Sequence, residues 1–148
     1  MLITAAVVLF LVLALLGALL FVSPGTPKPF LDDAGRPLAG SISEKIRVNI
    51  NGALQGMFIQ GRNSGNPVLL YLHGGLPDHF LTDRYPTGLE DIFTVVWWEQ
   101  RGSGLSYHPD MPPDTLNPEQ LVSDTVALTN VLRARFGQDK IYLMGRSG

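Results

Sequence analysis

Four consecutive residues carry the clearest chemical signal in this sequence. Gly145, Arg146, Ser147 and Gly148 match the first four positions of G-x-S-x-G, a motif in which a serine hydroxyl attacks a carbonyl carbon. The turn that presents such a serine is sharp and strained, so its neighbours must be nearly free of side chains. An ordinary turn with the same residues is the alternative. Because the motif directly follows an apolar run, we interpret Ser147 as the candidate catalytic nucleophile.

A second glycine-rich segment follows an earlier apolar run. His73, Gly74 and Gly75 come directly after Val68–Leu72. Acyl transfer needs backbone N–H groups that point at the developing oxyanion, and glycine lets the backbone approach a substrate closely. We therefore predict an oxyanion hole formed by the N–H groups of Gly75 and Gly148, with His73 and Gly74 supporting the loop. His73 as a catalytic base, and the glycines as a plain tight turn, are the alternatives.

A third loop contains Glu99-Gln100-Arg101-Gly102-Ser103-Gly104. It has neither the G-x-x-x-x-G-K-[ST] nor the G-x-G-x-x-G spacing of phosphate-binding loops. Arg101 has several donors in fixed geometry, so we predict that it supports the loop by bonding neighbouring carbonyls, with substrate contact as the alternative. His79 and His108 show no HxH or HExxH spacing, and the chain has no cysteine, so we expect no metal site.

Each of these loops follows a short apolar run, at Val68–Leu72, Ile92–Trp98 and Ile141–Met144. Runs of this length without alternation are typical of parallel strands that are buried on both faces. In open α/β sheets the chemistry collects at the carboxyl ends of the strands, and all three loops lie there. The sequence therefore predicts one sheet edge that brings the three loops together.

A hairpin is predicted before the first of these runs. Residues 45–50 alternate between polar and apolar side chains, and Leu54–Gln60 is the expected return strand. Asn51-Gly52 between them is a strong signal for a two-residue hairpin turn.

Helices are predicted between the apolar runs. Asn117 is a suitable N-cap, Pro118 fits the first helical position, and Gly137 is a natural stop. A shorter helix is expected within Asp78–Asp91. Strand and helix then alternate along the chain, which is typical of an α/β domain with a parallel sheet.

The first 22 residues differ from all the others. Leu2–Val22 has no charged side chain, and the 11 basic and 13 acidic residues of the chain all lie after it. A helix of that length spans about 30 Å, as the hydrocarbon core of a bilayer does. We predict a single-pass membrane anchor at residues 1–22 that contacts the membrane through residues 2–22. The alternatives are a cleaved signal, which would leave the protein secreted or periplasmic, and a buried core helix. Lys28 and Arg36 slightly favour a cytoplasmic body, and the side stays open.

The remaining chain divides into two parts. Residues 23–40 are rich in proline and glycine and are predicted to form a linker, which leaves residues 41–148 as the α/β domain. The net charge of −2 and the lack of a basic run argue against a nucleic-acid partner.

Taken together, the three loops resemble the α/β-hydrolase superfamily. HGG, EQRGSG and GRSG follow successive strands, and the first two look most like the prolyl-aminopeptidase-like branch, which typically has HGGPG and DQRG. This sequence has Leu76-Pro77 after the glycines, Glu99 in place of the aspartate, and Gly148 where an aromatic residue is common. The resemblance covers Ser41 to Gly148 and implies the N-terminal part of an α/β-hydrolase fold, with an antiparallel hairpin followed by parallel strands and helices. With the apolar segment, the expected fold is this domain preceded by one transmembrane helix.

The resemblance also implies a mechanism. Ser147 would attack the ester, thioester or amide carbonyl of a small molecule or peptide, and water would hydrolyse the acyl-enzyme without a cofactor. Dehalogenases and epoxide hydrolases of this superfamily use an aspartate instead. The family's carboxylate and histidine follow the serine, so we expect a truncated, inactive portion of a hydrolase, with Ile141–Met144 as an exposed edge strand. The alternatives are a membrane-anchored, non-catalytic binding or interaction protein with a similar fold, and a small, partly folded membrane protein.

Overall fold

Two antiparallel strands begin the sheet in the computed structural model, which describes residues 2–22, 25–82 and 84–147. Strand β1 covers Ile42–Ile50 and β2 covers Ala53–Gly61, with Ile50 opposite Ala53. The two turn residues, Asn51 and Gly52, have φ angles of 47° and 79°. Positive φ at both positions is what a type I′ hairpin turn requires. The predicted hairpin is confirmed.

Three parallel strands continue the sheet: β3 (Val68–Leu72), β4 (Thr94–Trp98) and β5 (Tyr142–Gly145). The strand order is β1-β2-β4-β3-β5, with β3 parallel to both β4 and β5 and β4 antiparallel to β2. The carboxyl ends of the parallel strands therefore lie at the same edge, as predicted. Strand β5 is an exposed edge in the described part of the chain, because it pairs there with β3 alone.

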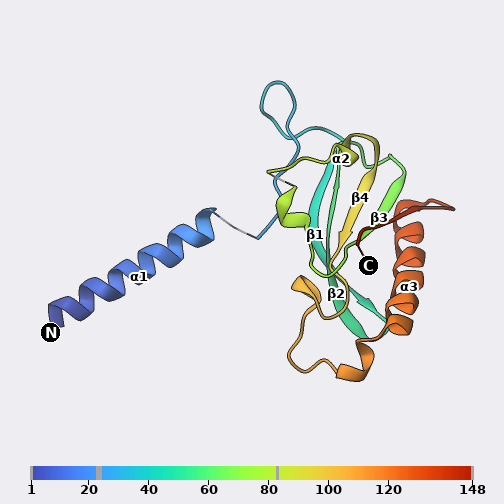
Figure 1. Cartoon of the computed structure of the whole chain (residues 1–148). Coiled ribbons are helices and arrows are strands. Elements are labelled where there is room, and N and C mark those ends of the chain that lie inside the picture. The colour runs from blue at the N-terminus through green and yellow to red at the C-terminus, as the bar shows by residue number, and fades with distance from the viewer. Residues whose placement is uncertain (1, 23–24, 83, 148) are drawn as a thin grey trace.

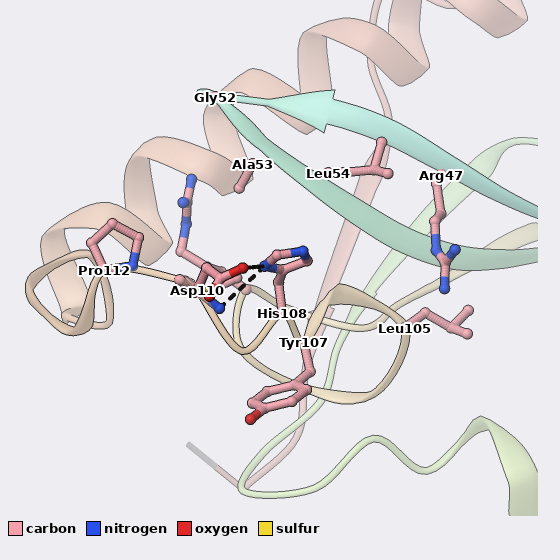
Figure 2. A pocket seen from close by; sticks show the side chains of 11 residues that line it. Arg47, Gly52, Ala53, Leu54, Leu105, Tyr107, His108, Asp110 and Pro112 are labelled. Carbon is pink, nitrogen blue, oxygen red and sulfur yellow. Dashed lines mark hydrogen bonds and ion pairs between the residues drawn. The ribbon is translucent and has the colours of Figure 1, made fainter.

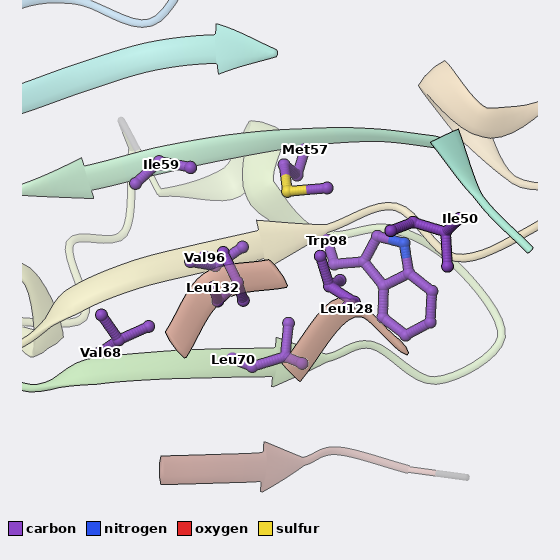
Figure 3. Close-up of a cluster of buried hydrophobic side chains, with 9 residues drawn as sticks. All are labelled: Ile50, Met57, Ile59, Val68, Leu70, Val96, Trp98, Leu128 and Leu132. Carbon is purple, nitrogen blue, oxygen red and sulfur yellow. The ribbon is translucent and has the colours of Figure 1, made fainter. Parts of the chain in front are cut away.

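Helix α3 (Pro118–Phe136) covers one face of the sheet (Figure 1). Its boundaries agree with the prediction, since the Asn117 side chain accepts a hydrogen bond of 2.7 Å from the Gln120 N–H, and Gly137 ends the helix with a φ of 61°. Leu128 and Leu132 of α3 are fully buried against the sheet in the main apolar cluster (Figure 3). This cluster comprises Ile50, Met57, Ile59, Val68, Leu70, Val96, Trp98, Leu128 and Leu132.

The opposite face of the sheet has a smaller core and less regular cover. Leu69, Tyr71, Val95 and Trp97 form a second buried cluster there. In the described part of the stretch Asp78–Asp91, the regular structure is a 3-10 turn, His79–Leu81, and the first residues of the short helix α2, Leu89–Ile92. Pro86 and Gly88, the latter with a φ of 73°, explain why no longer helix forms before α2. Because α2 includes Ile92, β4 begins two residues later than predicted.

Helix α1 (Leu2–Val22) lies apart from the sheet (Figure 1), and its described side chains, residues 4–19, are all exposed. Within the described residues, no helix has both the length and the apolar character that crossing a bilayer demands. The predicted transmembrane helix at residues 1–22, its membrane contact through residues 2–22 and the single-pass localisation are therefore wrong.

The segment predicted as a linker, residues 23–40, is described from residue 25 onward. Leu31 and Pro37 pair in an isolated bridge, and Asp32 and Arg36 form an ion pair of 2.9 Å across the same small loop. The division of the chain at residues 22 and 40 stays a prediction.

Candidate active site at the carboxyl edge of the sheet

The backbone turns sharply at Ser147, directly after β5. Ser147 has a φ of 50° and is, with Asn51, one of two non-glycine residues with positive φ in the described chain. An L-residue in this region is unfavourable by about 1–2 kcal/mol, so the surroundings have to hold it there. The Arg146 N–H donates to the Leu72 carbonyl at 3.0 Å, which extends the pairing of β5 with β3 up to the residue before the turn.

The HGG loop after β3 packs directly against this turn. A Cβ atom placed on Gly74 would lie 2.8 Å from the Arg146 carbonyl oxygen, 2.9 Å from the Ser147 carbonyl carbon and still closer to the Ser147 oxygen. Only glycine fits at this position without moving the backbone. Gly75, in contrast, is exposed, and a Cβ there would meet no described atom within 4 Å. Gly148, the second predicted oxyanion donor, lies outside the described residues.

His73 joins the HGG loop to the loop after β4. Its side chain is buried, its Nδ1 lies 2.7 Å from the Gly74 carbonyl, and its Nε2 accepts from the Gln100 N–H at 3.1 Å. The Gln100 side chain returns a hydrogen bond of 2.9 Å to the His73 carbonyl. These partners assign the proton to Nδ1 and occupy both ring nitrogens. His73 makes no hydrogen bond to Ser147 in the described part of the chain.

Arg101 is buried and pairs with Asp124 of α3. Its Nε donates to Asp124 Oδ2 at 2.7 Å, and its terminal nitrogen donates to Asp124 Oδ1 and to the carbonyls of Ile50 and Asn51 at 3.0, 3.2 and 3.3 Å. The exposed fractions of the two side chains are 7% for Arg101 and 0% for Asp124. The pair ties the loop after β4 to the hairpin and to α3.

Asp124 is the centre of this network, and the sequence interpretation missed it. Its carboxylate also accepts hydrogen bonds from the side chains of Asn51, Gln55 and Gln120 at 2.9, 2.7 and 2.8 Å. Burial alone would raise the pKa of Asp124, but the hydrogen bonds from Arg101, Gln120, Asn51 and Gln55 outweigh it and hold the pKa below its ordinary value. The helical spacing could have indicated it, because residue 124 lies four residues before Leu128 and eight before Leu132, on the same buried face of α3.

Ser147 opens onto a cavity of about 830 Å³. The backbone of the HGG loop and of the serine turn forms one part of its lining, and Leu121, Val122 and Val126 of α3 form an apolar wall. A second pocket of about 340 Å³ lies between the hairpin and the loop that carries His108 and Asp110 (Figure 2), and it shares no lining residue with the first. The cavity beside Ser147 is therefore the candidate site.

No described residue stands ready to activate Ser147. Its Oγ makes no hydrogen bond to another described residue, and His79 and His108 have partners elsewhere, namely Gln60 at 2.7 Å and Asp110. The described residues also include no group of three His, Cys, Asp or Glu side chains that could hold a metal ion.

The strand order, the turn at Ser147 and the adjoining HGG loop define the α/β-hydrolase class of fold. Comparison with known proteins agrees, although no protein-family model matches the sequence. The chain is 38% identical over 113 residues to the probable aminopeptidase YbaC of Bacillus subtilis (strain 168), a match that covers 75% of this chain and 36% of that protein.

Solved structures also resemble this chain and have the α/β-hydrolase fold. A proline iminopeptidase-related protein of Thermus thermophilus is similar with a TM-score of 0.57 and 28% identity, over 71% of this chain and 36% of that one. An epoxide hydrolase of Vigna radiata has a TM-score of 0.56 and 26% identity, over 71% and 32%. The resemblance to the α/β-hydrolase superfamily, and to its prolyl-aminopeptidase-like members, is thereby confirmed. The chain spans about a third of the length of these relatives.

Proposed function

We propose that this chain contributes the nucleophile and both oxyanion donors of an α/β-fold serine hydrolase. One observation carries the proposal: Ser147 sits on a positive-φ turn directly after a parallel strand, packed against a glycine loop at the mouth of a cavity. A serine hydroxyl presented in this way can reach a bound carbonyl, which is what acyl transfer requires.

In this mechanism Ser147 Oγ attacks the carbonyl carbon of an ester, thioester or amide, and its proton passes to a base. The N–H groups of Gly75 and Gly148 donate to the oxyanion, while His73, Gly74 and Arg101 hold the loops around it. Collapse of the tetrahedral intermediate releases the alcohol, thiol or amine and leaves an acyl-serine, which water hydrolyses. The substrate is a small molecule or peptide with such a carbonyl.

A serine at position 147 favours acyl transfer over the chemistry of the epoxide hydrolases among the similar structures. Those enzymes resemble this chain in fold, but the superfamily's epoxide hydrolases use an aspartate at this turn. The aminopeptidase-like relatives, whose names indicate amide hydrolysis, agree better with a serine.

We further propose that the 148-residue chain is inactive alone. Ser147 Oγ has no hydrogen-bonded base in the described part of the chain, and a serine hydroxyl without a base is a weak nucleophile at neutral pH. The chain matches about a third of its relatives, which leaves room for the acid and base in the rest of such a protein.

External base tests the proposal directly. The purified chain is incubated with a fluorophosphonate probe, with and without imidazole, and the modified residue is located by mass spectrometry. We expect little labelling without imidazole and clear labelling of Ser147 with it, because imidazole can accept the serine proton. Ser147→Ala should abolish this labelling, and Ser64→Ala, a change at an exposed serine, should retain it.

Two results would contradict the proposal in different ways. Rapid labelling of Ser147 without imidazole would refute the inactivity of the isolated chain and leave the nucleophile in place. Equal labelling of the parent and Ser147→Ala proteins in imidazole would refute the nucleophile and favour a non-catalytic binding protein with this fold.

A further inference from the structure

An ion pair connects the serine turn to the segment that follows the HGG loop. The Arg146 guanidinium donates to Asp78 Oδ2 at 2.6 Å, and the Tyr71 hydroxyl donates to the same oxygen at 3.1 Å. Arg146 directly precedes Ser147, and Asp78 lies three residues after Gly75. The pair therefore joins the two segments that carry the proposed nucleophile and the proposed oxyanion donor.

The Asp78 side chain is well shielded, unlike the partners in an ordinary surface pair. Its exposed fraction is 16%, against 62% for Arg146, and its Oδ1 is buried without a hydrogen-bond partner in the described chain. The charge is therefore balanced through Oδ2 alone, by a cation and a buried hydroxyl. Exposed pairs contribute little to stability, whereas charge-assisted bonds in shielded positions are stronger.

Tyr71 of strand β3 supplies the second donor to Asp78. Its exposed fraction is 5%. Burial raises the pKa of the Tyr71 phenol above its ordinary value, against the opposing effect of Arg146, so the hydroxyl stays protonated and can donate. Asp78 is thus attached to the rigid sheet as well as to Arg146.

Arg146 is consequently held at two points. Its N–H donates to the Leu72 carbonyl at 3.0 Å and its side chain donates to Asp78, so its two partners flank the HGG loop in the sequence. Gly74 lies between Leu72 and Asp78 in the sequence, and its backbone packs closely against the backbone of Arg146 and Ser147. The residues before and after the HGG loop are thus both bonded to Arg146.

We propose that Asp78 is a positioning residue, which acts through Arg146 to hold Ser147 Oγ in register with the Gly75 N–H. The inference rests on the proposed function, since it assigns Asp78 a role in that same site. Reacting groups have to be placed to within about 0.5 Å, and a displacement near 1 Å can lower a rate about a hundredfold. A turn that holds an L-residue at positive φ needs such external support.

Two readouts on the full 148-residue chain test this role. The first is the hydrogen-exchange rate of the Arg146 amide, measured by NMR, and the second is the rate of Ser147 labelling by the fluorophosphonate in imidazole. For Asp78→Asn we expect the Arg146 amide to exchange roughly tenfold faster and Ser147 labelling to slow by a similar factor. The Val96 amide in the central strand β4 should be unaffected.

Three further variants separate positioning from general stability. Arg146→Met should reproduce both effects, and Arg146→Lys, which keeps the charge, should restore most of the labelling rate. Asp91→Asn is the matched control, because it also removes an aspartate from an ion pair. Asp91 pairs with Arg62 at 2.9 Å, and neither residue belongs to the serine turn. It should leave both readouts unchanged.

The outcomes separate a failure of the positioning role from a failure of the proposed function. An unchanged Arg146 exchange rate in Asp78→Asn would overturn the positioning role, as would faster exchange with an unchanged labelling rate. If Ser147 of the unsubstituted chain is not labelled in imidazole, the proposed function fails, and the assignment of a catalytic positioning role to Asp78 fails with it. The exchange rates then still report whether Asp78 holds the turn.

Discussion

Substituting Gly74 by alanine tests whether the two loops of the site meet through their backbones. Gly74 and Gly75 both have φ angles outside the left-handed region, so alanine is conformationally acceptable at either position. At Gly74 the new Cβ would lie 2.8 Å from the Arg146 oxygen and 2.9 Å from the Ser147 carbon, whereas an ordinary contact is 3.4 Å or more. The atoms in the way are backbone, so no side-chain rotation can relieve the overlap.

The expected cost follows from the displacement. The serine turn or the HGG loop has to move by more than about 0.6 Å, the shortfall at the Arg146 oxygen, because the Ser147 oxygen lies closer still. Added methyl groups at tightly packed positions typically destabilise a protein by about 1–3 kcal/mol. We expect Gly74→Ala to lower the free energy of unfolding in urea by that amount and to accelerate exchange of the Arg146 amide.

Gly75→Ala is the matched control for this substitution. A Cβ at position 75 meets no described atom within 4 Å, and alanine keeps the backbone N–H that is the proposed oxyanion donor. Both substitutions restrict the unfolded chain similarly, so the difference between them isolates the contact. Equal stability of the Gly74→Ala and Gly75→Ala proteins would refute the close approach of the two backbones.

Two further predictions concern the framework. Asp124→Asn leaves the buried Arg101 charge without its partner and should cost about 3–5 kcal/mol in urea unfolding. Because the folded pKa of Asp124 lies below its ordinary value of 3.8, its stabilisation is complete above about pH 4 and disappears as the pH falls through the folded pKa. The stability gap between parent and Asp124→Asn should therefore hold from about pH 7 down to about pH 4 and narrow as the pH falls further, and a constant gap would contradict the assignment. Asn117→Ala removes the acceptor of the Gln120 N–H and should cost about 1 kcal/mol in the same assay, while Asn117→Asp should retain most of the stability.

Elements that depend on a few consecutive residues could be predicted from the sequence. The Asn51-Gly52 turn and the Gly137 helix stop each require positive φ, which these residue types adopt easily, and both appear where expected. The apolar composition before residue 23 was a poorer guide, because it predicted a transmembrane helix that the described structure does not support. The sequence predicted a short helix within Asp78–Asp91 but not that α2 would begin only at Leu89, although Pro86 and Gly88 disfavour a helix before that residue.

The candidate site was predictable in outline but not in its connections. Parallel strands bring their carboxyl ends together, so the loops at Gly74, Arg101 and Ser147 could be placed at one edge from sequence alone. The partners of these loops come from distant parts of the chain. Asp124 is 23 residues from Arg101 and Asp78 is 68 residues from Arg146, so their pairing is decided by packing and not by any local pattern.

The network around Asp124 also bears on the order of folding. Its donors come from the hairpin, from the loop after β4 and from α3, across separations of up to 73 residues. The hairpin and α3 consist of local contacts and can form early, whereas Asp124 gains all its donors only after hairpin, sheet and helix have docked. Burying this carboxylate earlier would leave its charge unmatched, which disfavours partly docked states. The buried charge therefore makes the final assembly of the domain more cooperative, in addition to stabilising its finished form.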